Sequence, residues 1–193
     1  MADAFDPKHA HRLEDPARLE ALPRAAVVTL LRLDGAETVV DYGAGTGTYT
    51  IGVAEAVPRG RVVAVEALPA LAGLLREKLT PELAERLDVV ETDANRVPLA
   101  DGAADRVVMV DVLHHLYDQP GALDEVVRLL RPGGLFVVLD WGDCERPLGP
   151  PLDHVLGLAA VRDIVTGMCL DEVEAHEPGE LVPYHLALVA AKK

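Results

Sequence analysis

Short apolar runs alternate with amphipathic segments along most of the chain. The apolar runs, rich in valine and leucine, lie at 37–42, 61–66, 87–90, 105–111 and 135–140. Continuous apolar runs of this length predict strands that are buried on both faces of a sheet. The segments at 48–56, 68–79, 81–87 and 120–130 carry apolar residues at helical spacing. This alternation predicts a parallel sheet with helices on both of its faces.

The N-terminal segment, residues 1–35, predicts a helical preface to this sheet. Asp15-Pro16 is a typical helix start, because proline fits the first helical position. Pro23 divides the segment into two helices, and we expect Gly35 to end the second one.

The C-terminal segment is expected to finish the sheet with a hairpin. Asp153 is a candidate N-cap for a helix that runs to about Met168. The runs 170–177 and 182–190 then predict two strands. We therefore expect one domain over residues 1–193, with 1–35 as a helical lid and 36–193 as an α/β core, since a chain of 193 residues fits one domain.

A glycine-rich loop directly follows the first predicted strand. The strand ends in Asp41, and Gly43, Gly45 and Gly47 occupy alternate positions after it. Glycine lets the backbone approach a ligand closely at a helix N-terminus. A dinucleotide fingerprint requires Gly-x-Gly-x-x-Gly, and its third glycine would fall at Thr48. A nicotinamide oxidoreductase is therefore disfavoured, whereas a ligand with a nucleoside and an amino group would accept the nearby acid.

The loop resembles motif I of the class I S-adenosylmethionine-dependent methyltransferases, and further landmarks follow in the family's order. Glu66 ends the second predicted strand, about 20 residues after the loop, where a carboxylate can accept ribose hydroxyls. Asp93 follows the third strand and Asp111 ends the fourth. The run Leu-Arg-Pro-Gly-Gly-Leu at 130–135 precedes the fifth.

The resemblance implies a fold and a cofactor. The fold is α/β, a single-domain Rossmann-like sheet of seven strands, mostly parallel, with an antiparallel C-terminal hairpin strand and helices on both faces. The cofactor is S-adenosyl-L-methionine. The residues implied to bind it are Asp41, Gly43, Ala44, Gly45, Gly47, Glu66, Ala67, Asp93, Ala94, Asp111 and Val112.

His114 is the candidate catalytic residue, because it follows the fourth strand, where donor and acceptor meet in this fold. A histidine there can act as a base near neutral pH. His115, Trp141 and His11 are the candidate substrate-lining residues. Structural roles are the alternative: one histidine would pack against adenosine and the other would cap a helix, and Trp141 would fill the core.

The resemblance is strongest to small-molecule methyltransferases such as those of ubiquinone and menaquinone biosynthesis. We expect an enzyme that methylates a small molecule, with a non-catalytic cofactor-binding module or partner subunit as the alternative. The net charge of −14 disfavours nucleic acid and anionic membrane as partners. We expect a cytoplasmic protein without a metal site, since His9-x-His11 alone is a weak metal signal, and we leave a homodimer open.

Overall fold

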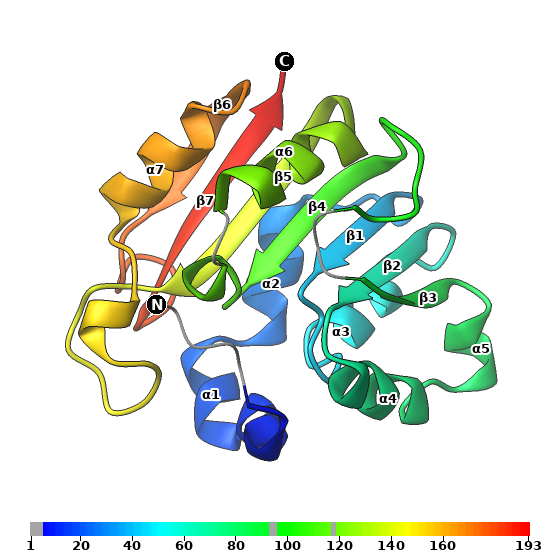
Figure 1. Cartoon of the computed structure of the whole chain (residues 1–193), viewed down its shortest axis with the longest axis horizontal. Helices are drawn as coiled ribbons and strands as arrows, with labels where there is room; N and C mark the ends of the chain where they lie inside the picture. The colour runs from blue at the N-terminus through cyan, green and yellow to red at the C-terminus, as the bar shows by residue number, and fades with distance from the viewer. Residues whose placement is uncertain (1–5, 93–95, 117–118) are drawn as a thin grey trace.

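A seven-stranded sheet forms the centre of the protein (Figure 1). The computed structural model describes residues 6–92, 96–116 and 119–193. The strand order is β3-β2-β1-β4-β5-β7-β6, and β7 runs antiparallel to both of its neighbours. The strands are β1 (Thr38–Tyr42), β2 (Arg61–Glu66), β3 (Leu87–Glu91), β4 (Ala104–Val110), β5 (Leu130–Trp141), β6 (Leu170–His176) and β7 (His185–Lys192). The expected mostly parallel sheet with an antiparallel hairpin strand is confirmed.

Helices cover both faces of the sheet (Figure 1). They are η1 (Pro7–Glu14), α1 (Pro16–Ala21), α2 (Arg24–Leu31), α3 (Thr50–Ala56), α4 (Pro69–Glu77), α5 (Pro81–Ala84), η2 (Leu113–His115), α6 (Gln119–Leu129), η3 (Leu152–His154) and α7 (Leu158–Thr166). The core has two parts: α6 and α7 pack on one face through residues such as Val126 and Val161, and α2 and α3 on the other through Leu30 and Val53.

Two helix boundaries differ from the sequence-based predictions. Helix α2 ends at Leu31, with Arg32 in the left-handed region at φ 50°, and not at Gly35. Gly35 instead belongs to the following turn, where its N–H donates to the Glu37 carboxylate at 3.0 Å.

The Asp153 cap is also wrong. Asp153 lies in the exposed 3₁₀ turn η3, and α7 begins only at Leu158 after Gly157. The helix starts where buried positions at helical spacing start, with Leu158, Val161 and Val165 in the core. Tertiary packing therefore overrides a local capping preference here.

Candidate active site

One cavity of about 750 Å³ lies at the carboxyl ends of β1, β2, β4 and β5. This is where open α/β sheets bind ligands, and the volume is within the roughly 300–1,000 Å³ of small-molecule sites. The N-terminal segment and the loop at residues 148–151 cover the cavity. Of the expected cofactor residues, Asp41, Gly43, Ala44, Gly45, Glu66, Ala67, Asp111 and Val112 line it. Gly47 is not in the lining, and Asp93 and Ala94 lie outside the described residues.

The glycine loop needs glycine for its backbone conformation and, at two positions, for packing. All three have positive φ, at 85°, 58° and 82° for Gly43, Gly45 and Gly47. A Cβ on Gly47 would lie 2.1 Å from the Leu75 side chain, and one on Gly43 would lie 2.5 Å from Val112. These two positions thus need glycine for packing within the protein. Among the described residues, a Cβ on Gly45 would meet only the Leu13 side chain, at 3.2 Å, which comes from the N-terminal segment.

Glu66 joins the loops that follow β1 and β2. Its carboxylate accepts the N–H of Gly45 at 2.7 Å and the N–H of Leu68 at 2.8 Å. The side chain is nearly buried and faces the cavity. Each carboxylate oxygen can accept a second hydrogen bond, so Glu66 fits a diol as well as the backbone.

Asp41 is a buried carboxyl beneath the same loop. Burial raises its pKa to about 6, and the nearby charge of Glu66 acts in the same direction. The Thr50 hydroxyl donates to Asp41 at 2.5 Å and partly opposes this shift. A cationic ligand group beside Asp41 would favour its ionised form.

His114 forms a buried dyad with Asp140, the penultimate residue of β5. Its Nδ1 lies 2.5 Å from one Asp140 oxygen, and its backbone N–H donates to the other at 3.1 Å. Burial lowers the pKa of His114, but the hydrogen bond and charge of Asp140, with the charge of Asp111, raise it above its ordinary value. Because Asp140 occupies Nδ1, Nε2 is the nitrogen left for chemistry in the cavity.

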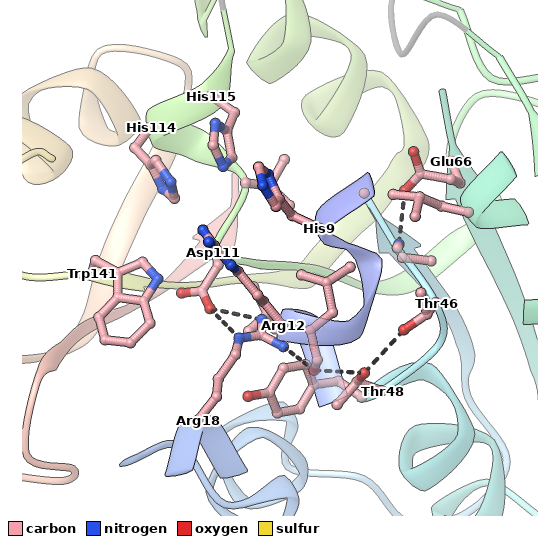
Figure 2. A pocket seen from close by; sticks show the side chains of 18 of the residues that line it. His9, Arg12, Arg18, Thr46, Thr48, Glu66, Asp111, His114, His115 and Trp141 are labelled. Atoms are coloured by element: carbon pink, nitrogen blue, oxygen red, sulfur yellow. Dashed lines mark hydrogen bonds and ion pairs between the residues drawn. The ribbon is translucent and has the colours of Figure 1, made fainter. Parts of the chain in front are cut away.

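Asp140 is not among the site residues predicted from the sequence, although its position in the sequence gives a signal. Like Asp41 and Glu66, it is an acid at the carboxyl end of an apolar strand. The other expected residues of this region, His115 and Trp141, also line the cavity (Figure 2).

Asp111 is the centre of a second buried cluster. It has φ 56°, an uncommon conformation for a residue other than glycine. Nε and Nη2 of Arg18 donate to one carboxylate oxygen at 3.2 and 2.8 Å. The other oxygen lies 3.1 Å from Nε2 of His185, whose ring centroid is 4.0 Å from that of Trp141. Burial raises the pKa of Asp111, but the charges of His185 and Arg18 outweigh it and hold the pKa well below its usual range.

The N-terminal segment is bonded directly to the glycine loop. The carbonyl oxygen of Leu13 accepts from Arg18 at 2.7 Å and from the Thr48 hydroxyl at 3.0 Å. Lys78 donates to the Thr46 carbonyl at 2.7 Å and pairs with Glu14. The segment therefore closes one wall of the cavity.

The expected substrate-lining residue His11 lies on η1, which is a 3₁₀ helix. With three residues per turn, positions three apart lie on one face. His9 and Arg12 are such a pair and line the cavity, whereas His11 is exposed and does not. In the described ranges, no three His, Cys, Asp or Glu residues gather as metal ligands would. The same ranges hold no helix whose length and apolar character would suit a bilayer crossing.

Comparisons with known proteins agree with this geometry. A family model described as a methyltransferase domain matches residues 40–138. The crystal structure of a SAM-dependent methyltransferase from Aquifex aeolicus matches with a TM-score of 0.90 and 27% identity, over 98% of this chain and 100% of that chain. The [4+2]-cyclase SpnF matches with a TM-score of 0.73 at 17% identity, over 88% of this chain and 80% of that one, which shows the fold alone.

A curated relative adds a sequence match to these structural ones. The ubiquinone/menaquinone biosynthesis C-methyltransferase of Syntrophotalea carbinolica is 30% identical over 125 residues, 65% of this chain and 52% of the relative. The chain spans about half the length of the curated relatives it matches. From the family model, the Aquifex structure and the acid-glycine loop at the sheet's carboxyl edge, the chain belongs to the class I S-adenosylmethionine-dependent methyltransferase family.

Proposed function

We propose that this protein transfers the methyl group of S-adenosylmethionine to a small-molecule acceptor. The observation that carries the proposal is the convergence of Asp41, the glycine loop, Glu66 and His114 on one cavity. When bound, S-adenosylmethionine supplies a sulfonium methyl group that an acceptor takes by in-line displacement.

The lining residues fit the cofactor group by group. Glu66 retains acceptor capacity for the two ribose hydroxyls, and the loop at Gly45 gives backbone access. The Asp41 carboxyl lines the cavity and accepts from the Thr50 hydroxyl beneath it, so it offers an acid that suits an amino group. Asp111 and Val112 line the same cavity. The cofactor roles of Asp93 and Ala94 stay predictions from the sequence.

A small acceptor suits the covered cavity better than a macromolecule. The N-terminal segment and the Leu148–Pro151 loop both line it, so an acceptor must fit between them. Trp141, Leu116 and Leu148 give this part of the wall an apolar surface. The named relative acts in quinone biosynthesis, which supports an acceptor of small size.

His114 is proposed to take the acceptor's proton through Nε2. Asp140 holds Nδ1, which fixes the tautomer and orients the ring. Trp141 and His115 are proposed to line the acceptor position.

Calorimetry and a labelled-methyl assay test this function. S-adenosylhomocysteine should bind to the parent protein and NAD should not. Glu66→Ala should weaken S-adenosylhomocysteine binding by about 1–3 kcal/mol, because ribose hydroxyls lose a charged acceptor. With S-adenosylmethionine carrying a tritiated methyl group, label should enter small molecules from a deproteinised cell extract.

Each possible failure has a different meaning. Unchanged affinity in Glu66→Ala would remove the ribose role, and NAD binding in place of S-adenosylhomocysteine would overturn the function. Tight S-adenosylhomocysteine binding without any label transfer would favour the non-catalytic binding module.

A further inference from the structure

The two ends of the cavity differ in charge. Glu66 and Asp41 lie at the end formed by β1, β2 and the glycine loop. Figure 2 shows Arg12, His114 and His115 grouped away from Glu66. His9, on the same face of η1 as Arg12, also lines the cavity. The end beside the candidate base therefore carries hydrogen-bond donors and positive charge.

Arg12 is the feature that the proposed function leaves unused. Its side chain extends from η1 into the cavity toward the histidines of η2 (Figure 2). Within the described residues, the Arg12 side chain makes no hydrogen bond, ion pair or ring contact, and only its backbone carbonyl accepts, from the Asp15 N–H. Arg18, on the next helix, donates instead to both Asp111 and the Leu13 carbonyl. Arg12 thus presents a guanidinium with its donors available to a ligand.

The acids near this end do not neutralise Arg12. The Asp111 carboxylate is engaged by Arg18 on one oxygen and faces His185 on the other. Asp15 is exposed, and it caps α1 by accepting the Ala17 N–H at 2.9 Å. In a chain with a net charge of −14, an unpaired arginine in a cavity is unusual and points to an anionic ligand.

The surroundings of Arg12 favour a flat, partly apolar anion. Leu13, Leu116 and Trp141 line the same cavity as Arg12. A carboxylate or phenolate that receives hydrogen bonds from Arg12 would have its apolar body against these side chains. The body would also lie beside His114, where a proton is proposed to leave.

We propose that the methyl acceptor is a small anion, with a carboxylate or phenolate group that docks on Arg12. This inference rests on the proposed function and names the substrate class of the same site. Arg12 is a specificity residue in this proposal: it orients the acceptor, and His114 remains the base.

The test uses benzoate and its neutral analogue benzamide as probes. Each probe is titrated into full-length protein saturated with S-adenosylhomocysteine, and binding is followed by ligand-observed NMR. The parent should prefer benzoate by about tenfold, since a hydrogen bond to a charged group contributes about that factor. Arg12→Gln should lose the preference, Arg12→Lys should keep part of it, and Arg59→Gln should keep all of it. Arg59 is the matched control because it is an exposed arginine at the other end of the sheet.

A second measurement separates the acceptor from the cofactor, which also carries a carboxylate. S-adenosylhomocysteine and 5′-methylthioadenosine, which lacks that carboxylate, are titrated separately into the parent and Arg12→Gln. Equal affinities in the two proteins for both ligands support the acceptor role. A loss for S-adenosylhomocysteine alone would assign Arg12 to the cofactor and overturn the proposal.

Two further outcomes would also overturn it: no preference for benzoate in the parent, or a preference that survives in Arg12→Gln. Because Arg12 is exposed and unpaired, its variants should unfold at the parent's temperature, and circular dichroism checks this. Failure of the parent to bind S-adenosylhomocysteine would instead reject the proposed function itself.

Discussion

The Arg18 guanidinium lies 2.8 Å from the Asp111 carboxylate and joins helix α1 to the end of strand β4. Their side chains are only 10% and 7% exposed, so this ion pair is largely removed from water. Arg18 also lies over the Tyr49 ring, 5.1 Å from its centroid. The pair therefore attaches the N-terminal cover to the floor of the cavity.

Replacing Arg18 with Met should destabilise the protein by about 3–5 kcal/mol, because the buried Asp111 carboxylate would lose its arginine partner. Urea denaturation measures the free energy of unfolding, and Arg59→Met is the exposed control. The double variant Arg18→Met/Asp111→Asn should lose less than the sum of the two single losses. Additive losses would contradict a direct interaction.

Gly45→Val should abolish S-adenosylhomocysteine binding while the sheet stays folded. Valine is strained at φ 58°, and its side chain would project beside Leu13 at the cavity wall. Calorimetry measures the binding, and far-ultraviolet circular dichroism the fold. Gly73→Ala is the control: it lies inside α4 with open space around it, so it should stabilise the protein by about 0.5–1 kcal/mol and leave binding unchanged. Parent-like affinity in Gly45→Val would exclude this loop as the ligand site.

Asp41 should make stability fall as the pH rises from about 4 to about 6. Its pKa is about 6 in the folded protein and about 3.9 in an unfolded chain, so the folded state binds the proton more tightly. The stabilisation by protonated Asp41 is complete below about pH 4 and is lost by the time the pH exceeds 6. The Asp41→Asn variant lacks this titration. The difference between the free energy of unfolding of the variant and that of the parent should therefore rise by about 2–3 kcal/mol, in favour of the variant, from about pH 4 to pH 6. Urea midpoints for both proteins at several pH values provide the measurement, and parallel curves would contradict the assignment.

His114 has a linkage of the same sign as Asp41, at higher pH, because its pKa is also raised in the folded protein. A raised histidine pKa stabilises the fold fully below the unfolded value of about 6.5, and this contribution is lost as the pH rises through the folded value. Asp140→Asn should lower the His114 pKa, because it removes the partner charge. Proton NMR of the imidazole carbons follows the titration, and the exposed His154 on η3 serves as the internal reference. The rising limb of the pH–rate profile should move to lower pH in the variant. If the His114 pKa measured by NMR falls in the variant but the pH–rate profile does not shift, His114 is not the base.

The sheet could be predicted from sequence because its signals are local. The sequence predicts a strand at 61–66, and β2 forms at Arg61–Glu66, where a valine-rich run is bounded by Gly60 and by a helix that begins at Pro69. The glycine loop could also be placed, since positive φ at alternate residues leaves a direct mark on the sequence.

The rest depended on contacts between distant parts of the chain. His114 with Asp140 and Arg18 with Asp111 are pairs that only the fold brings together. A short polar segment also does not reveal which of its histidines faces the cavity, and in the structure His9 lines it while His11 is exposed.

Glu66 has a consequence for the energetics of any ligand at this loop. Its carboxylate already fixes the N–H groups of Gly45 and Leu68, which belong to separate loops. A glycine-rich segment would otherwise lose much conformational entropy when it becomes ordered around a ligand. In this protein that ordering occurs during folding, so an arriving nucleoside meets a preorganised wall and retains more of its binding free energy.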